Sequence, residues 1–529
     1  MSFMEAALGS GAVPLIAIDG PVAEIKRHIR MAVPSSWADK TFPYMYSLGF
    51  GIRPLTTKKH DYEPTDQFIG QDGCYAMLEW LDEIGRKAID QNRKTKIWLF
   101  VFDLGKLKED VTMTSMLAHL SDTEGPLVRT STSIILCGPG IIHDLPPELS
   151  EQTVKLRCPY PSAEEIKSLL VSVYTAGEEQ PPDKKTLDRL AREAAGMTSA
   201  QVANLGARSI YEFSGINDQM LREEVQEMMA DLPGVSLLDT TGFTMDTIGG
   251  YDAVKNSMLS LINAYDNKPL VAPKGICLFG PPGTGKTALA RVVGNEVGWK
   301  VILVSPSEFK DKYVGETGKN MSKLIALAEA VAPCILVLDE VDGAFGSSSG
   351  AKESDTSGDM LTILLTWMSQ PRKKPVFMVA TCNRLDKLPP EFSRAGRFDK
   401  KFFMDVPGAA AKDKIWQHYT TKYNLGKWAR PNDEDWTGAE IETCCQIAYI
   451  EDVGLEDAGK QIVPIVSQMG EGFLTSLRKY ASTSCLDSET GQRVKFLGKG
   501  AAVPPPPPPP LPMADAEAGG KTIQKKKKG

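Results

Sequence analysis

The chain has 529 residues, of which 42% are hydrophobic and 24% charged, and its formal net charge is −7. This length predicts two to four domains, because a single hydrophobic core rarely grows so large. The negative charge disfavours a nonspecific nucleic-acid coat, which needs excess positive charge to neutralise phosphates. The nine cysteines are scattered without a CxxC pair, so neither a zinc site nor a disulfide framework is indicated.

The N-terminal segment has no basic start, so it does not read as a secretory signal. No apolar stretch approaches the roughly 20 residues that cross a bilayer. We therefore expect a protein without a membrane span, located in the cytoplasm or the plastid stroma.

Five regions follow one another along the chain. They are an α/β region (1–155), a helical lid or linker (156–240), a second α/β region (241–407), a second helical lid (408–495) and a tail (496–529). Apolar runs at 15–18, 97–102 and 134–137 predict strands in the first region. The tail contains a proline run (504–510) and ends in lysines (525–528). The prolines predict an extended spacer or a docking segment for a Pro-binding domain.

The first and second halves repeat three features in the same order. Leu145-Pro-Pro-Glu-Leu-Ser150 matches Leu388-Pro-Pro-Glu-Phe-Ser393, and each follows an apolar strand. Each half also has an earlier apolar strand that ends in an aspartate, Asp103 or Asp339. Coincidence is the alternative, since Pro-Pro is common in loops. Three ordered matches favour duplication of one module.

A glycine-rich loop joins a predicted strand (275–279) to a predicted helix. Its sequence, Gly280-Pro-Pro-Gly-Thr-Gly-Lys286-Thr287, has the form of a phosphate-binding loop in the strand–loop–helix context that this motif requires. Lys286 is expected to reach the β- and γ-phosphates, and Thr287 to offer its hydroxyl to Mg²⁺. The predicted nucleotide contacts are Gly280, Pro281, Pro282, Gly283, Thr284, Gly285, Lys286, Thr287 and Ala288.

Two carboxylates follow a second apolar strand, Ile335-Leu-Val-Leu-Asp339-Glu340. A buried parallel strand delivers them to the carboxyl edge of the sheet, where a nucleotide binds. Asp339 is expected to hold Mg²⁺, and Glu340 to polarise the attacking water. Asp342 is interpreted as a neighbouring surface carboxylate.

The third strand (376–383) ends in Asn383. Beside the γ-phosphate this amide would sense the phosphate and orient the water. An asparagine after a strand is more often a turn former, so this role depends on the other two elements.

Two arginines follow in Arg394-Ala-Gly-Arg397-Phe-Asp399. Arginines stabilise the charge on a transferring phosphoryl group, and a neighbouring subunit often supplies them. Arg394 and Arg397 are both expected to complete the site of an adjacent subunit, and the finger interpretation is preferred for Arg394. For Arg397 the alternative is a structural ion pair with Asp399.

These residues together resemble the AAA+ ATPases, over residues 245 to 450. Ile248-Gly249-Gly-Tyr251 is similar to the segment that begins an AAA module and contacts adenine. Lys312-Tyr313-Val314-Gly resembles the first pore loop, in which an aromatic residue grips a threaded chain; a packed surface aromatic is the alternative for Tyr313. Gly438-Ala-Glu-Ile441 is similar to the lid motif of the clade of valosin-containing protein.

A closer likeness is to the Ycf-type AAA ATPases of cyanobacteria and plastids. It is carried by Ala332-Pro-Cys-Ile-Leu, Thr366-Trp367, Pro375-Val-Phe-Met-Val-Ala-Thr and Gly396-Arg-Phe-Asp-Lys-Lys-Phe-Phe403. Members of that family have an N-terminal half like an AAA module without working nucleotide chemistry. In this chain no phosphate-binding loop follows Asp19, and Leu104 stands where a catalytic Glu would follow Asp103.

The expected fold is therefore α/β, with tandem P-loop NTPase-like AAA+ modules, each a parallel sheet flanked by helices with a helical lid. The resemblance implies an ATPase that uses ATP and Mg²⁺ and assembles into a ring, expected to be a hexamer. The first hypothesis for its function is remodelling or unfolding of protein substrates. An ATP-switched assembly or signalling scaffold is the second, and a nucleic-acid motor ranks behind both.

Overall fold

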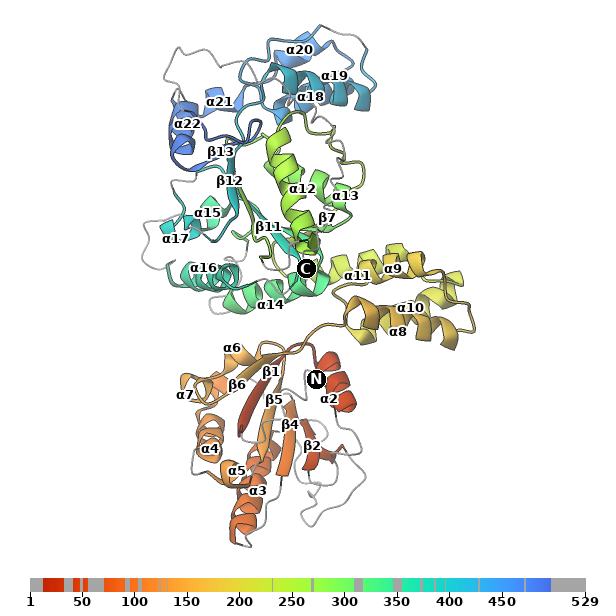
Figure 1. Ribbon diagram of the computed structural model, residues 1–529, viewed down its shortest axis with the longest axis vertical. Coiled ribbons are helices and arrows are strands. Elements are labelled where there is room, and N and C mark those ends of the chain that lie inside the picture. Colours follow the sequence, from red (N-terminus) through yellow and green to blue (C-terminus); the bar gives the residue numbers. More distant parts are fainter. Residues whose placement is uncertain are drawn as a thin grey trace, which may run out of the picture.

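The computed structural model describes residues 13–32, 41–47, 51–55, 71–90, 96–102, 107–122, 125–130, 132–230, 232–267, 271–308, 317–345, 354–371, 374–384, 387–394, 396–426, 429–470 and 472–495. Asp103, Leu104, Tyr313, Val314 and the tail 496–529 lie outside the described residues. The described residues form two sheets, each with helices on its faces, and two further groups of helices (Figure 1).

The first module is built on a sheet in the order β3-β2-β4-β5-β1-β6. Its strands are β1 (Leu15–Asp19), β2 (Thr41–Ser47), β3 (Gly51–Pro54), β4 (Lys96–Phe102), β5 (Ser133–Gly138) and β6 (Val154–Arg157). Its helices are α2 (Val22–Ala32), α3 (Gln71–Asp90), the 3₁₀ turn η2 (Leu107–Glu109), α4 (Val111–Ser121), α5 (Pro126–Thr130), α6 (Ile141–Asp144) and α7 (Pro147–Ser150). The apolar runs of β1, β4 and β5 are buried, as is typical of parallel strands covered on both faces.

A helical bundle follows the first module. It consists of α8 (Ala163–Ala176), α9 (Lys184–Glu193), α10 (Ser199–Phe213) and α11 (Asp218–Ala230). A capping box at Ser162 and Glu165 begins α8, and a second at Thr198 and Gln201 begins α10.

The second module is built on a sheet in the order β13-β12-β8-β11-β10-β9-β7. Its strands are β7 (Val235–Leu238), β8 (Gly275–Phe279), β9 (Lys300–Val304), β10 (Cys334–Leu338), β11 (Val376–Cys382), β12 (Lys400–Phe403) and β13 (Leu486–Asp487). Its helices are α12 (Asp252–Asn267), α13 (Lys286–Val297), α14 (Thr317–Val331), α15 (Val341–Phe345), α16 (Ser354–Ser369) and α17 (Pro390–Ser393).

The C-terminal helices are α18 (Ala409–Lys422), α19 (Gly438–Glu451), α20 (Leu455–Gly459), α21 (Ile465–Gln468) and α22 (Phe473–Ser484). Helices α18 to α20 enclose a core of their own around Trp416, Trp436 and Ile441. The chain then returns to the sheet: Leu477 on α22 packs against the core of the second module, and β13 pairs with β12.

The two sheets share one strand order. In the first, β6-β1-β5-β4-β2 are all parallel neighbours. In the second, β12-β8-β11-β10-β9 are parallel neighbours in the corresponding order. The matching Leu-Pro-Pro-Glu segments lie at equivalent places, since α7 precedes β6 and α17 precedes β12. This agreement confirms the predicted tandem arrangement of two α/β modules.

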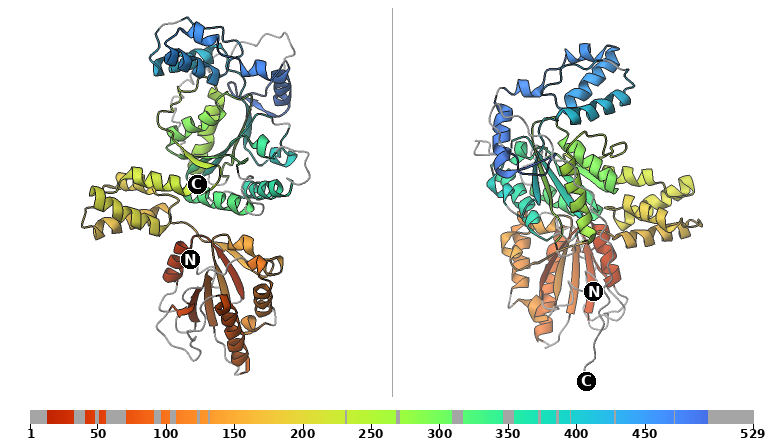
Figure 2. Two further views of the ribbon diagram at one scale, coloured as in Figure 1. Left: turned by 180° about the vertical axis from the view of Figure 1, so that it is seen from behind. Right: turned by 45° about the horizontal axis from the view of Figure 1, so that its top comes forward.

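The helical bundle packs against the second module. Ile166, Leu170 and Met197 of the bundle belong to the same buried cluster as Ile302 and Val331 of the second module. The contact is close, because a Cβ atom on Gly196 would lie 2.5 Å from Cγ2 of Val331. Both views of Figure 2 show the bundle beside the second module. The bundle therefore follows the first module in the chain but shares its core with the second.

Candidate nucleotide site

The glycine-rich loop between β8 and α13 borders a cavity of about 330 Å³ at the carboxyl edge of the second sheet. Gly285 is the N-cap of α13 and has φ +84°, and Gly283 has φ +81°. A side chain disfavours this left-handed backbone, so glycine allows the loop to curl with its N–H groups turned inward. The start of α13 adds positive potential at the same place. This end of the cavity suits a phosphate group.

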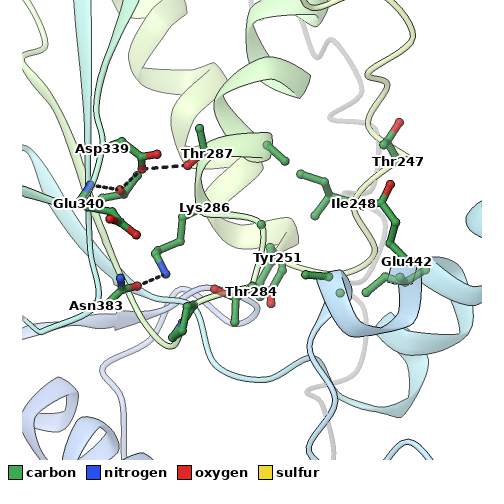
Figure 3. Close-up of a pocket in the computed structure, with 18 of the residues that line it drawn as sticks. Thr247, Ile248, Tyr251, Thr284, Lys286, Thr287, Asp339, Glu340, Asn383 and Glu442 are labelled. Atoms are coloured by element: carbon green, nitrogen blue, oxygen red, sulfur yellow. Dashed lines mark hydrogen bonds between the residues drawn. The ribbon is translucent and has the colours of Figure 1, made fainter. Parts of the chain in front are cut away.

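Residues from distant parts of the second module and the C-terminal helices line the cavity together (Figure 3). They are Thr247, Ile248, Tyr251, Pro282, Gly283, Thr284, Gly285, Lys286, Thr287, Ala288, Asp339, Glu340, Thr381, Asn383, Ile415, Tyr419, Gly438, Ala439 and Glu442.

Lys286 is the first residue of α13 and is buried. Its ammonium donates hydrogen bonds to the carbonyl oxygens of Gly280 (3.0 Å) and Pro281 (2.8 Å) and to Oδ1 of Asn383 (2.9 Å). Burial lowers the pKa of Lys286 to about 8, although the carboxylates of the site act in the opposite direction. The three hydrogen-bond partners of this ammonium are all neutral. A phosphate bound in the cavity would give it a negatively charged partner.

Asp339 lies at the end of β10, where two hydroxyls donate hydrogen bonds to its Oδ1. One is the Thr287 hydroxyl, at 2.9 Å, and the other is that of Thr381 on β11. The Thr381 hydroxyl also accepts the Glu340 N–H at 3.0 Å. Thr381 therefore connects both carboxylate residues to the neighbouring strand. Mg²⁺ is coordinated by oxygen ligands and is often held by a carboxylate together with phosphate oxygens. The Thr287 hydroxyl and the Asp339 carboxylate lie side by side and fit this ion.

The backbone of Glu340 has φ +49°, an unusual value for a residue with a side chain. The strained residue lies two positions after the end of the buried strand β10 and lines the cavity. Such strain persists only where the surrounding contacts hold it, and it concentrates at functional sites.

Asn383 follows β11, and its position depends on Asp342. The Asp342 carboxylate accepts the Asn383 N–H and, at 2.9 Å, the Arg384 N–H. The interpretation of Asp342 as a surface carboxylate was therefore wrong: it is half-buried and holds the chain that presents Asn383. Asp342 is the second residue of α15, three positions after Asp339, and its hydrogen bonds place it beside the end of β11.

The far end of the cavity is lined by Thr247 and Ile248 on one side and by the C-terminal helices on the other (Figure 3). The Ala439 N–H in the first turn of α19 donates to the Gly283 carbonyl at 3.2 Å, so α19 touches the phosphate loop directly. Tyr419, which donates to Glu442 at 3.0 Å, also faces this end. The spacing of residues in the sequence did not single out Thr381, Tyr419 or Glu442.

Several predicted site residues lie beside the cavity without lining it. Gly280 and Pro281 contribute their carbonyl groups to Lys286. Gly249 packs against α18, where a Cβ atom would lie 2.3 Å from the Ala411 carbonyl oxygen. The predicted pore-loop residues, Tyr313 and Val314, lie outside the described residues.

The two arginines of the Arg-x-Gly-Arg segment do not line the cavity. The Arg394 side chain is 70% exposed, and its Nη2 lies 3.9 Å from Oε1 of Glu391. Arg397 is half-buried, and its Nη1 has no hydrogen-bond partner among the described residues. The Asp399 carboxylate instead accepts the backbone N–H groups of Lys274 (2.7 Å) and Gly275 (2.8 Å) at the start of β8.

The first module lacks the equivalent of the phosphate loop. Only Gly20 and Pro21 separate β1 from α2, whereas residues 280–285 separate β8 from α13. The first two residues of α2 are Val22 and Ala23, at the positions that Lys286 and Thr287 hold in α13. The first module therefore offers neither an ammonium nor a hydroxyl at this point.

None of the helices described is long and apolar enough to cross a membrane. Within the same residues, His, Cys, Asp and Glu side chains do not gather into a group of three or more that would hold a metal ion.

Comparison with known proteins places the site in a family. Residues 276–406 match the model of the ATPase family associated with various cellular activities (AAA). The uncharacterized AAA domain-containing protein ycf46 of Guillardia theta is 27% identical over 388 residues, which cover 70% of this chain and 74% of that protein.

Two further relatives align over a shorter part of the chain. The proteasome-activating nucleotidase of Methanocella arvoryzae is 36% identical over 47% of this chain and 59% of its own length. The 26S proteasome regulatory subunit 8 homolog of Saccharomyces cerevisiae is 33% identical over 40% of this chain and 55% of its own length. The second module thus matches the AAA family, and over most of its length the chain is similar to a ycf46 protein.

Proposed function

We propose that the second module binds ATP with Mg²⁺ and hydrolyses it. The observation that carries this proposal is the convergence of Lys286, Thr287, Asp339, Glu340 and Asn383 on one cavity. These residues come from the first turn of α13 and from the ends of β10 and β11. Their side chains match the separate tasks of phosphoryl transfer: a cation for the phosphates, oxygen donors for the metal, a carboxylate for the water and an amide to orient it.

In the proposed reaction each residue has one task. The Lys286 ammonium exchanges the loop carbonyls for β- and γ-phosphate oxygens. Thr287 and Asp339 hold Mg²⁺, which neutralises phosphate charge when it is bound. Glu340 polarises the water for in-line attack on the γ-phosphorus, and Asn383 orients that water from the end of β11.

We further propose that the protein works as a ring, expected to be a hexamer. Arg394 is exposed and does not line the cavity of its own module, so it is available to a neighbouring subunit. There its guanidinium would stabilise the charge on the transferring phosphoryl group. Arg397 is proposed to act with it on the neighbouring site; it is half-buried, and its Nη1 has no hydrogen-bond partner among the described residues.

The proposed use of hydrolysis is remodelling of protein substrates, with Tyr313 and Val314 as the pore loop. Relatives named as a proteasome-activating nucleotidase and a proteasome regulatory subunit support this use. The cytoplasm or the plastid stroma stays the predicted location.

Glu340→Gln tests the chemistry. This change removes the base but keeps the size of the side chain, so ATP binding should stay within about twofold while turnover falls by about a hundredfold or more. Lys286→Ala is the matched control, since it should abolish binding as well. Hydrolysis at the normal rate in Glu340→Gln would rule out the proposed site.

An ATP-switched scaffold is the second candidate. The first module favours it, because it keeps the strand order of the second without the phosphate loop, which suits a surface for assembly. Full cellular activity of Glu340→Gln would favour the scaffold, because that variant should bind ATP without turning it over. Loss of remodelling in Tyr313→Ala with normal hydrolysis would favour the motor.

A further inference from the structure

Glu24 on α2 is a fully buried carboxylate in the module that lacks the phosphate loop. Buried carboxylates are rare unless they are paired, and this one has three donors. The Ser199 N–H donates to its Oε1, the Ser199 hydroxyl to Oε2 at 3.3 Å, and Arg27 Nη1 to Oε2 at 3.1 Å.

Ser199 is the first residue of α10 in the helical bundle. The N–H groups of a first helical turn have no partners within the helix, and the helix dipole makes this end positive. The carboxylate of Glu24 therefore occupies a place that favours an anion. It comes from the first module, whereas the helix belongs to the bundle.

Arg27 extends this contact to a second helix of the bundle. Its Nη2 donates to Oε1 of Glu165, on α8, at 2.5 Å. Partial burial acts to raise the pKa of Glu165, but the Ser162 N–H and Arg27 outweigh it and lower that pKa to about 2. One helix of the first module is thus joined by charged hydrogen bonds to two helices of the bundle.

The second module has a corresponding pair of helices. Both α2 and α13 follow the equivalent strand of their sheet: β1 lies between β6 and β5, and β8 lies between β12 and β11. Both α10 and α19 begin with a capping box after a threonine, Thr198 or Thr437. In the second module the start of α19 faces the phosphate loop, through the bond between the Ala439 N–H and the Gly283 carbonyl.

We infer that Glu24 is a permanent internal replacement for a bound phosphate: it latches the bundle to the first module without nucleotide. The comparison with the second module rests on the function proposed above. There a ligand would lie between α13 and the lid helix, and its loss would release α19. In the first module the anion is covalently part of α2, so the orientation of the bundle stays fixed.

This latch has a consequence for the whole chain. Since the bundle shares a buried core with the second module, it joins the two modules. Because the contact of α2 with α8 and α10 is fixed, the first module and the bundle move as one unit. The ATP-driven movement then falls between α18–α20 and the second sheet.

Amide hydrogen exchange on the full chain tests the latch. We measure the segments at the start of α10 (199–202) and of α19 (438–441), with and without ATP and Mg²⁺. The wild-type protein should show ATP-dependent protection at 438–441 and none at 199–202. Without nucleotide, Glu24→Gln should speed exchange at 199–202 by about tenfold, because a charge-assisted hydrogen bond becomes a neutral one.

Glu24→Ala should raise this exchange further, and Arg30→Ala, an exposed change on the same helix, should leave it unaltered. The inference is overturned if Glu24→Gln exchanges like the wild type at 199–202, or if ATP protects that segment. A chain that fails to bind ATP would contradict the proposed function alone, because the comparison of the variants needs no nucleotide.

Discussion

The Asp342 carboxylate accepts the backbone N–H of Asn383 at distances of 3.2 Å from Oδ1 and 3.3 Å from Oδ2. Asn383 in turn accepts a hydrogen bond from Lys286 at 2.9 Å. Asp342 does not line the cavity, but its carboxylate sets the position of Asn383, which does. Small displacements of positioned groups lower rates steeply.

Asp342→Ala should therefore lower kcat for ATP hydrolysis by about tenfold or more, with little change in KM. The Asn383 and Arg384 N–H groups lose their acceptor, while the phosphate loop stays intact. Asp342→Asn, which keeps one acceptor oxygen, should recover part of the rate. Steady-state kinetics of the two variants make the comparison, and an equal rise in KM for both would contradict a role confined to Asn383.

Thr381→Val should lower both the thermal stability of the protein and its apparent affinity for Mg²⁺. The hydroxyl of Thr381 bonds Asp339 and the Glu340 N–H, and valine has nearly the same shape without it. Loss of a hydrogen bond of this kind costs about 1 kcal/mol, so thermal unfolding should begin at a slightly lower temperature. More Mg²⁺ should be needed for half-maximal hydrolysis. Thr381→Ser keeps the hydroxyl and should behave like the wild type in both measurements.

ATP affinity should depend on pH through Lys286. Burial places the pKa of this ammonium at about 8, and bound phosphates favour its charged form. Below pH 8 the lysine is already charged and affinity should be flat. Above pH 8 binding must take up a proton, so affinity should fall by up to about tenfold per pH unit. Calorimetry in buffers of different ionisation enthalpy detects this proton; no uptake at pH 8.5 would place the pKa elsewhere.

Each chain should bind one ATP. The first module has Val22 and Ala23 in place of Lys286 and Thr287, and the turn before α2 is too short to enclose phosphates. Lys286→Ala in the full chain should therefore abolish binding in equilibrium dialysis. One remaining ATP per chain in that variant would assign a working site to the first module.

Arg394 and Lys286 should act at the same site from different subunits. Arg394→Ala and Lys286→Ala should each be nearly inactive alone. Mixed in equal amounts they should recover about a quarter of the wild-type rate, because some sites then combine an intact Lys286 with an intact Arg394 from the neighbour. Arg53→Ala, a change in the first module, is the control for mixing. No recovery after subunit exchange would place Arg394 outside the catalytic arrangement.

The fold and the phosphate end of the site were accessible from sequence because they depend on local patterns. The strands at 15–18, 97–102 and 134–137 are continuous apolar runs, and all three are found as β1, β4 and β5. The glycine-rich loop is one segment, so its residues are neighbours in the chain as well as in space.

The remaining contacts join residues that are far apart in sequence. Asp342 reaches the end of β11 only because β10 and β11 are adjacent strands, and Glu24 meets Ser199 only after the bundle folds back on α2. Short elements such as β6 and β7 also escaped prediction. These two segments form strands because they pair with longer strands, β1 and β9, and their own composition contributes less.

The short strand β7 has a practical consequence for cutting the chain. It pairs antiparallel with β9, from Val235 opposite Val304 to Leu238 opposite Val301, and so covers the outer edge of the second sheet. A truncated protein that starts at residue 241 would expose that edge and the apolar face under the bundle. Unpaired edges recruit strands from other molecules, so we expect such a fragment to aggregate. A fragment that starts at residue 160 should stay in solution.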